Sequence, residues 1–408
     1  MNAIAPGGTP IEHVFVLMLE NRSFDHMFAL SGIPGIVAAT SGNTNSYNGT
    51  TYAFGGGAPD PMPTDPGHEF TDVLEQLCGA GVPFTKGAAY PPVLNGGFAS
   101  NYATSHTEGA PPPAASVGAI MQGVDTAAQS PAMYRLATEF ALCDGWRASL
   151  PGPTWPNRFF LHGASSAGLD HSPTSAEMAA WEPLGGFAYP NGSIFDALGK
   201  GNYRLYQDDS GLLCGRVPQV ASIKGIGFFD VDGLSHFGAD LNAGYTARYT
   251  FIEPSYGNIV QSTYEGGTSQ HPMDRLAAGD QLVARVYNAI RNSPLWQSSL
   301  LVILYDEHGG FYDSVEPGEA ARPNDNAPAT LNANGFLFDV YGVRVPAIVV
   351  SPWVRQGVID HTVYDHSSVL ATLERLFDIP SLTERDRNAT DLLSLISTTC
   401  RVDCPETL

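Results

Sequence analysis

The chain has 408 residues, of which 43% are hydrophobic, so it can bury a substantial core and is not a disordered segment. Its formal net charge of −21 argues against nucleic acid as a partner and against electrostatic docking on an anionic membrane. It does not exclude a phosphate ester, because a bound cation can reverse the local field.

From the sequence we expect neither a transmembrane segment nor a signal peptide. No run approaches the roughly 20 apolar residues that span a bilayer. The segment from Met1 to Pro10 lacks a basic region followed by an apolar one. We therefore expect either a cytoplasmic protein or a mature secreted form.

Four apolar runs bounded by polar residues predict buried strands. They lie at His13–Leu19, Tyr249–Glu253, Leu300–Tyr305 and Val345–Val350. Their residues do not alternate with polar ones, which is typical of strands covered on both faces. This pattern predicts a mostly parallel sheet.

Helical periodicity lies between these strands. Ser130 followed by Pro131 predicts a helix start, and that helix extends to about Ala141. Apolar spacing predicts two further helices over Asp274–Ile290 and His366–Phe377. The resulting fold class is α/β, with a mostly parallel central sheet between helix layers.

The region from about 41 to 123 differs from the rest because it is rich in Gly, Pro, Thr and Asn and weakly periodic. It predicts a long loop excursion over the sheet, and such loops are often functional. Since no repeat or linker divides the chain, we interpret residues 1–408 as one domain.

Five cysteines in a chain of this length do not make a disulfide framework. Cys400 and Cys404 are close enough in sequence to pair, whereas the other three are scattered. Cys143 follows an apolar run and is interpreted as a small core residue.

Polar residues follow two of the predicted strands directly. Glu20 and Asn21 end the first run, and Asp306 and Glu307 end the third. In open α/β sheets, ligands bind beyond the carboxyl ends of the strands, and converging carboxylates repel unless a cation lies among them. The alternative is that Glu20 and Asp306 pair with Arg22 or cap helices.

The segment 151–158 (PGPTWPNR) predicts a rigid turn, because two prolines and a glycine precede Thr154. Such a turn can hold a hydroxyl at the start of a helix, as a nucleophile requires. The alternative is that Thr154 is an ordinary N-cap for a helical segment over Asn157–His162.

Two histidines lie in loops, His68 in DPGHE and His271 in SQHP. Imidazole suits proton transfer near neutral pH and contact with phosphoryl oxygens. The alternative is a plain surface position. His26, His308 and His366 lie within the motifs and could be structural.

Together these motifs resemble the phosphoesterase family that includes bacterial and plant phospholipases C and the related acid phosphatase A. The resemblance is carried by ENRSFDH (20–26), PGPTWPNR (151–158) and DEHGGFYD (306–313), and it continues through 133–146, 271–272, 343–354 and 365–373. It covers most of the chain in the family's order. It implies an alkaline-phosphatase-like fold.

The resemblance assigns roles to seven residues. It implies one divalent metal ion, with ligands at Glu20, Asn21, Asp306 and Glu307. Oxygen ligands suit Ca²⁺, Mg²⁺, Mn²⁺ or Zn²⁺, and the sequence does not choose among them.

For the chemistry itself, Thr154 falls on the nucleophile position and His68 on a contact with the phosphoryl oxygens. His271 falls on a position that binds phosphate or protonates the leaving oxygen, and Asn21 also lies near the phosphoryl group. The implied reaction is metal-assisted hydrolysis through a phosphothreonine.

The chain departs from the family pattern at two places. Ser314 stands where the family has a histidine, and no histidine occurs around Lys224. His236 or Lys224 could substitute, or the contact could be absent.

The expected substrate is a small-molecule or lipid phosphate ester, and phospholipase C activity is the leading hypothesis. Acid phosphatase activity is the alternative, followed by a non-catalytic ion-binding protein. Oligomeric state is left open. A lipase needs an apolar lip, and the aromatic and methionine side chains that could form one, or could instead anchor the core, are Phe98, Tyr102, Met121, Trp155, Trp181 and Phe187.

Overall fold

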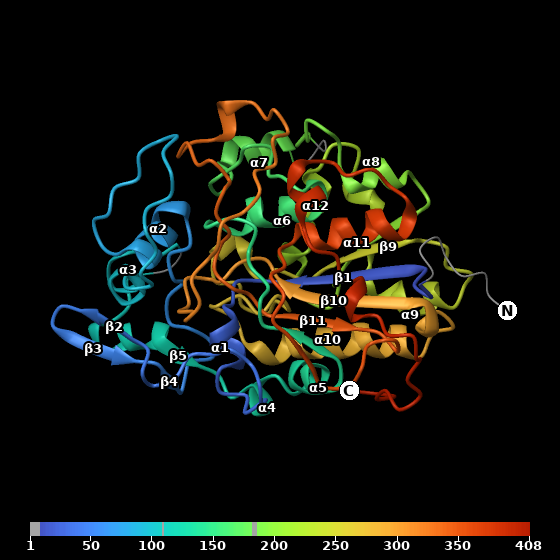
Figure 1. Cartoon of the computed structure of the whole chain (residues 1–408), viewed down its shortest axis with the longest axis horizontal. Helices are drawn as coiled ribbons and strands as arrows, with labels where there is room; N and C mark the ends of the chain where they lie inside the picture. Colours follow the sequence, from blue (N-terminus) through green and yellow to red (C-terminus); the bar gives the residue numbers. More distant parts are fainter. Residues whose placement is uncertain (1–8, 108–109, 182–185) are drawn as a thin grey trace.

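An eight-stranded sheet runs through the centre of the molecule in the computed structural model, which describes residues 9–107, 110–181 and 186–408 (Figure 1). Its strand order is β12-β6-β11-β10-β1-β9-β7-β8. Most of the stretch examined for a signal peptide, and residues 108–109 of the predicted excursion, lie outside the described residues. The strands are β1 (His13–Leu19), β6 (Ala141–Cys143), β7 (Tyr203–Gln207), β8 (Val231–Gly233), β9 (Tyr249–Glu253), β10 (Ser299–Tyr305), β11 (Ala347–Val350) and β12 (Val358–Asp360).

The sheet is mostly parallel, as predicted. β1 pairs in parallel with β10 and β9, and the parallel pairing continues through β7 to β8. Only β11, among the described strands of this sheet, runs against its neighbours β10 and β6. The four predicted strands are all present, and every residue of β1 and β10 is buried.

Helices cover both faces of the sheet (Figure 1). α5 (Pro131–Glu139) and α10 (Leu276–Arg291) pack together below it in this view, and α6 (Thr154–Gly163) and α11 (Ser367–Phe377) pack together above it. Each of the three predicted helices is present with its ends shifted by at most two residues or so. Outside the region 41–123, the other described α-helices are α1 (Phe24–Phe28), α4 (Thr126–Gln129), α7 (Ser175–Trp181), α8 (Ile194–Leu198), α9 (Phe237–Leu241) and α12 (Glu384–Asn388).

The start of α5 is held by another helix rather than by its own N-cap side chain. Ser130 is the N-cap residue and Pro131 is the first helical residue, as predicted. The backbone N–H groups of Ala132 and Met133 donate to the carboxylate of Asp280 in α10, at 3.0 Å each. The Ser130 hydroxyl also donates to Asp280, at 2.7 Å.

The region 41–123 is more ordered than its composition predicts. It contains a hairpin of β2 (Thr44–Tyr47) and β3 (Thr50–Ala53), the helices α2 (Phe70–Cys78) and α3 (Phe98–Thr104), and the short parallel pair β4 (Gly55–Gly56) and β5 (Gln122–Gly123). Side chains from these elements form a second hydrophobic cluster beside the main core. The region is the blue-to-cyan part at the left of Figure 1.

All five cysteines are free, so Cys400 and Cys404 do not form a disulfide here, and Cys143 is fully buried as predicted. Within the described ranges, no helix has both the length and the apolar character that crossing a membrane requires.

Candidate active site

Three acidic side chains meet where neighbouring strands end. β1 and β10 run in parallel register, with Leu19 opposite Tyr305, so Glu20 and Asp306 leave the sheet side by side. Glu253, the last residue of β9, reaches the same edge. The carboxyl edge of the central strands therefore carries the acidic cluster that the sequence predicts. Glu253 is an additional member of this cluster.

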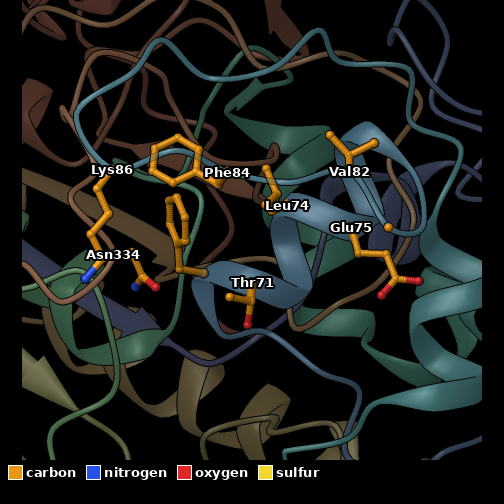
Figure 2. A pocket seen from close by; sticks show the side chains of 9 residues that line it. Thr71, Leu74, Glu75, Val82, Phe84, Lys86 and Asn334 are labelled. Carbon is orange, nitrogen blue, oxygen red and sulfur yellow. The ribbon is translucent and has the colours of Figure 1, made fainter.

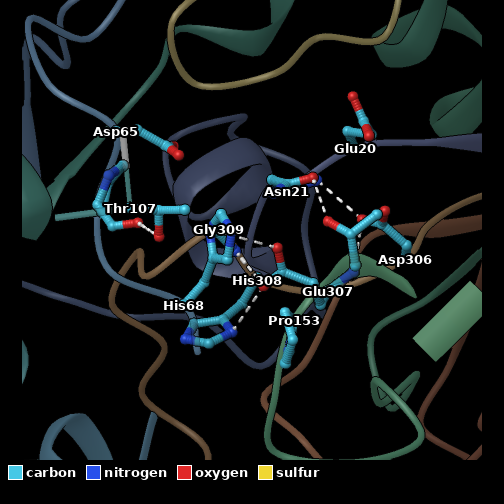
Figure 3. A network of polar contacts seen from close by, with 12 residues as sticks. Glu20, Asn21, Asp65, His68, Thr107, Pro153, Asp306, Glu307, His308 and Gly309 are labelled. Carbon is cyan, nitrogen blue, oxygen red and sulfur yellow. Dashed lines mark hydrogen bonds and ion pairs between the residues drawn. The ribbon is translucent and has the colours of Figure 1, made fainter. Parts of the chain in front are cut away.

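The Asp306 carboxylate joins the two strand ends by accepting a backbone N–H from the loop after β1 as well as one from its own loop (Figure 3). The N–H of Asn21 donates to Asp306 Oδ1 at 3.0 Å, and the N–H of Glu307 donates to the same oxygen at 2.7 Å. Asn21 has a φ of 58°, a left-handed conformation that asparagine tolerates better than most residues. Gly309 also has a positive φ, and a Cβ there would overlap the carbonyl group of Asn21. The glycine lets the two loops approach this closely.

Thr154 is the first residue of α6, and the N-cap is Pro153. The alternative that Thr154 is an ordinary N-cap is therefore wrong, because its hydroxyl does not cap the helix. It points instead to Asn21, with 3.4 Å between Thr154 Oγ1 and Asn21 Oδ1. The amide of Asn157 fixes the preceding turn by donating to the carbonyl oxygens of Gly152 and Pro153 at 2.9 and 3.0 Å.

Arg158, one helical turn beyond Thr154, is the cation that the acidic cluster contacts. Its Nε lies 3.0 Å from Asp306 Oδ2, and its guanidinium lies 3.9 Å from Glu20 and 3.8 Å from Glu253. Its Nη1 also donates to the hydroxyl of Tyr256 at 3.0 Å. The side chain is 2% exposed, so these charges interact with little solvent screening.

Arg22 does not take part in this cluster, contrary to the alternative that it pairs with Glu20 or Asp306. Its guanidinium donates to the backbone carbonyl oxygens of Gln270 and His271, at 2.8 and 3.1 Å. Arg22 therefore supports the loop that carries His271.

Burial dominates the electrostatics of the cluster. It raises the pKa of Glu20 above the usual range, although the Arg158 guanidinium lowers it. Burial likewise raises the pKa of Glu307, and the nearby His68 lowers it. Burial raises the pKa of Glu253 to about 7, again against the effect of Arg158. A bound cation would stabilise the ionised carboxylates and reverse these shifts.

His68 lies beside Glu307, with 3.8 Å between His68 Nδ1 and Glu307 Oε1 (Figure 3). It precedes α2 and is 5% exposed, so it is not a plain surface residue.

His271 is held in one orientation by three contacts. Its Nδ1 accepts a hydrogen bond from the N–H of Met273 at 3.2 Å, so in the neutral ring Nε2 carries the proton. Nε2 lies 3.7 Å from Asp65 Oδ1, and the ring stacks on Tyr264 with centroids 3.6 Å apart. Burial lowers the pKa of His271 well below its usual value, and His68 and Arg22 lower it further. His271 is therefore a neutral hydrogen-bond donor in this state.

A cavity of about 510 Å³ brings these groups together. Five of the seven predicted site residues line it, namely Glu20, Asn21, His68, Thr154 and His271. Asp306 and Glu307 do not line the cavity; they are fully buried in contact with the Asn21 backbone and with His68.

The predicted metal ligands offer only oxygen donors, which suit a hard divalent cation. Glu20 Oε2 and Glu307 Oε1 are buried without a hydrogen-bond partner, which is costly for a carboxylate oxygen. In the described parts of the chain, no three or more His, Cys, Asp or Glu side chains alone form a group that could hold a metal. An ion in this cluster would therefore need the amide oxygen of Asn21 as well as carboxylate oxygens.

The other motif histidines have structural contacts. His366 contacts the carbonyl oxygen of Asp306 at 2.6 Å, and His308 contacts the Gln76 amide oxygen at 2.8 Å. His26 lies between the carbonyl oxygen of Gln122 and the guanidinium of Arg22.

The histidine that the family places near Lys224 has no substitute in this cavity. Lys224 lines a different cavity, and His236 is exposed to solvent and is not among the lining residues. Between α6 and His271 in the chain, Val217 and Gln219 are among the residues that line the cavity, and the amide oxygen of Gln219 is buried without a hydrogen-bond partner. At the second departure, the N–H of Ser314 donates to the carboxylate of Asp25 at 2.6 Å.

Of the six side chains proposed for an apolar lip, only Trp155 lines the cavity. The other five are buried, in agreement with the alternative that they anchor the core: Phe98, Tyr102, Met121, Trp181 and Phe187. The apolar part of the cavity wall comes instead from Met178, Val217 and Ile259.

A separate cavity of about 330 Å³ opens beside α2, lined by residues such as Thr71, Phe84 and Lys86 (Figure 2). It contains none of the predicted site residues.

The sequence reasoning missed four residues of the site: Asp65, Arg158, Glu253 and Tyr264. Glu253 could have been found, because it ends a predicted strand as Glu20 and Asp306 do. Arg158 lies inside the PGPTWPNR motif, but its partners are on three other elements. Asp65 and Tyr264 carry no local signal in the sequence.

Comparison with known proteins identifies the family. The sequence model of the phosphoesterase family matches residues 11–380. The chain is 34% identical to Non-specific phospholipase C6 and 32% identical to Non-specific phospholipase C3 of Arabidopsis thaliana, over 98% of this chain and 75% and 76% of those proteins. It is 27% identical to Phospholipase C A of Mycobacterium tuberculosis, over 91% of this chain and 74% of that protein.

Among solved structures, the chain aligns with murine ectonucleotide pyrophosphatase/phosphodiesterase 5 at a TM-score of 0.40 and 10% identity, over 67% of this chain and 96% of that one. It aligns with an alkaline phosphatase superfamily protein from Vibrio parahaemolyticus at a TM-score of 0.36 and 13% identity, over 64% of each chain. The family model spans most of the chain, and relatives more than 30% identical match almost all of it. The chain therefore belongs to the phosphoesterase family.

Proposed function

We propose that the protein is a phospholipase C-type phosphodiesterase, which cleaves a phospholipid between the diacylglycerol oxygen and phosphorus. The observation that carries this proposal is the cavity in which Thr154 lies beside Asn21, with His68 and His271 in the same wall. The relatives named phospholipase C, which match 98% of the chain, support the substrate class.

In the proposed first step, Thr154 Oγ1 attacks phosphorus and releases its proton to solvent, and the bond from phosphorus to the diacylglycerol oxygen breaks. The start of α6 favours the negative charge that the phosphoryl oxygens carry there. The amide of Asn21 and the imidazole of His68 stabilise that charge. His271 Nε2–H donates a hydrogen bond to the departing oxygen and stabilises its negative charge, and that oxygen takes a proton from solvent and leaves as the alcohol.

In the second step, water attacks the phosphothreonine, and the bond between Thr154 Oγ1 and phosphorus breaks. The threonine hydroxyl is regenerated, and the head-group phosphate leaves the cavity. The covalent intermediate divides one displacement into two.

We also propose that Glu20, Asn21, Asp306 and Glu307 hold one divalent cation. When bound, such an ion lowers the pKa of a neighbouring hydroxyl and offsets the charge of the carboxylates. The support for it is the oxygen-only donor set with two buried, unpartnered carboxylate oxygens.

The charges around the cavity favour a phosphodiester over a phosphomonoester, the alternative substrate. Among the described residues, Glu20 and Glu69 line the cavity and no Lys or Arg does. A diester carries one negative charge near neutral pH, whereas a monoester carries up to two. Glu69 lies outside the proposed ligand set and repels the extra charge of a monoester.

The test compares three soluble or lipid substrates: p-nitrophenyl phosphorylcholine, phosphatidylcholine and p-nitrophenyl phosphate. We expect a higher kcat/KM for the two diesters. Replacing Thr154→Ala should reduce kcat by at least about 1000-fold, and Thr154→Ser should retain a measurable fraction. Thr138→Ala is the matched control, because Thr138 lies on α5 across the sheet and its hydroxyl bonds only its own helix.

A clear preference for the monoester would replace the phospholipase assignment with that of a phosphatase and leave the nucleophile in place. Near-wild-type turnover by a folded Thr154→Ala variant would rule out the nucleophile itself.

A further inference from the structure

Two short segments beside the cavity expose large apolar side chains. They contain the 3-10 helices η2 (Leu213–Gly215) and η6 (Ile259–Gln261). Leu213 is 81% exposed, Val260 is 79% exposed and Leu212 is 47% exposed. Apolar side chains this exposed, and gathered in one place, usually mark an interaction surface.

The two segments pack on each other and form part of the cavity wall. The N–H of Tyr256 donates to the carbonyl oxygen of Gly215 at 2.9 Å, and Cys214 Sγ contacts the carbonyl oxygen of Gly257 at 3.5 Å. The same segments contribute Val217, Tyr256, Ile259, Ser262 and Tyr264 to the lining of the cavity. The exposed apolar side chains therefore lie on the same two segments that form this part of the cavity wall. We call Leu212, Leu213 and Val260 the apolar rim.

The rim is free of acidic side chains, although the chain as a whole carries a net charge of −21. Residues 212–219 and 256–264 contain one charged residue, Arg216, whose guanidinium donates to the carbonyl oxygen of Gly211. The nearest acidic residue in sequence, the exposed Glu265, follows the second segment directly. A surface that approaches phospholipid head groups gains from the absence of carboxylates, because lipid phosphates repel them.

We propose that the apolar rim inserts into the surface of a phospholipid bilayer and so places the cavity mouth over the head groups. This proposal rests on the proposed phospholipase function and names its docking surface. Leucine and valine on short exposed segments suit shallow burial at the boundary between head groups and acyl chains. A second copy of the chain is a poorer occupant, since three side chains fall far short of the roughly 800 Å² per partner of a stable interface.

The experiment uses the full chain with a double variant, Leu213→Glu with Val260→Glu. The control is Val402→Glu, because Val402 is 95% exposed and its neighbour Arg401 contacts the end of α5, across the sheet from α6. Binding is measured by cosedimentation with phosphatidylcholine vesicles, and turnover is measured on vesicles and on soluble p-nitrophenyl phosphorylcholine. Sedimentation velocity gives the oligomeric state of each protein.

We expect the double variant to lose about tenfold or more in vesicle binding and in vesicle turnover, while turnover of the soluble diester and the behaviour of Val402→Glu stay unchanged. Equal vesicle binding by wild type and double variant would overturn the proposal, as would equal losses in the control. A wild-type dimer that the double variant dissociates would identify a second copy as the occupant and overturn it too.

Failure of the proposed function is a separate result. Rim-dependent vesicle binding without cleavage of either diester would contradict the phospholipase assignment and leave the docking surface standing.

Discussion

At the scale of single residues, Arg158 provides the positive charge that offsets the buried acidic cluster. Glu20, Glu253 and Asp306 leave three different strands and meet its guanidinium within 3.9 Å. A buried cation with three carboxylates is far more costly to remove than a surface ion pair, because each carboxylate would stay buried without its counter-charge. Arg158 also lies on the same helix as Thr154, so it ties the nucleophile to the sheet.

The first prediction concerns this residue. Arg158→Met should lower the free energy of unfolding by about 3–5 kcal/mol and reduce turnover of a soluble diester, because it leaves the buried carboxylates without a cation. Urea unfolding and kcat/KM measure the two effects, and Arg158→Lys should retain part of each. Arg375→Met, which breaks a pair that is 68% exposed at the arginine, should cost less than about 1 kcal/mol. Equal effects of the two Met variants would refute this role.

A second prediction at this scale concerns Gly309. Gly309→Ala should shift the Asn21 loop and reduce turnover, because the new methyl group overlaps the Asn21 carbonyl and the residue has a φ of 61°. The strain alone is worth about 1–3 kcal/mol. Gly318→Ala is the control, since a Cβ there meets no atom within 4 Å. Thermal unfolding and kcat/KM report the difference, and indistinguishable variants would contradict the close approach.

At the scale of elements, the first turn of α5 is hydrogen-bonded to a side chain of α10. Asp280 of α10 accepts hydrogen bonds from Ser130 and from the first N–H groups of α5, so one side chain caps a helix and docks it on its neighbour. The sequence shows the helix start at Ser130 and Pro131. It does not show that the acceptor comes from a helix almost 150 residues later.

The third prediction follows from this cap. Asp280→Ala should lower the free energy of unfolding by about 2–4 kcal/mol, since three buried donors lose their acceptor. Asp125→Ala, at the exposed N-cap of α4, should cost about 1 kcal/mol or less. Urea unfolding compares the two variants with wild type, and a similar small loss in both would show that Asp280 is not the cap that holds α5.

At the scale of the whole molecule, stability depends on pH through buried acids, and one of them, Glu374, lies outside the site. Burial raises the pKa of Glu374 on α11 from 4.5 to about 8, and Asp386 raises it further. The folded state therefore holds a proton that the unfolded chain releases above about pH 4.5, so this group lowers stability progressively between pH 4.5 and 8.

The fourth prediction is that Glu374→Gln removes this dependence. The variant should match wild type near pH 5 and exceed it by about 1–2 kcal/mol near pH 9, a figure reduced because the Ser381 hydroxyl donates to Glu374 Oε2 and stabilises the ionised form. Thermal unfolding at both pH values measures the difference. A variant that is less stable than wild type near pH 9 would refute the assigned cost of ionisation.

The fifth prediction concerns the proposed cation, with unfolding as the readout. After chelation, one of Ca²⁺, Mg²⁺, Mn²⁺ or Zn²⁺ at about 100 times its Kd should stabilise the fold by about 2.7 kcal/mol and restore turnover. Glu307→Gln should lose this stabilisation, whereas Asp403→Asn, at a side chain that is 67% exposed, should keep it. Stabilisation that is unaffected by Glu307→Gln would place the ion elsewhere.

Sequence patterns predicted the architecture of the molecule but not the whole site. Apolar runs fixed β1, β9 and β10 because fully buried parallel strands carry that signal locally. The helices α2 and α3 escaped prediction, since they lie among glycines and prolines and are stabilised by a cluster that forms only in the folded chain. The role of Arg158 was not predicted for a related reason, because its three carboxylate partners come together only when the sheet forms.

The single-domain division, the metal site and the roles of the predicted site residues stay predictions. The geometry that favours them was partly visible in the sequence, because residues that end neighbouring parallel strands must meet at one edge. Which strands would be neighbours was not visible, since β1 pairs with strands that follow it by more than half the chain.

The pairing of β1 with β10 also has a consequence for how the protein is made. Asn21 and the Asp306 carboxylate that it contacts are separated by 285 residues, and the other neighbour of β1 is β9, near residue 250. The ribosome therefore releases a strand that is apolar from Val14 to Leu19 long before either partner has been synthesised. An apolar strand without its partner strands is prone to aggregate. Pairing between strands that are distant in sequence is also slow. Production of this enzyme in cells should therefore depend on chaperones that shield the N-terminal strand until the last third of the chain emerges.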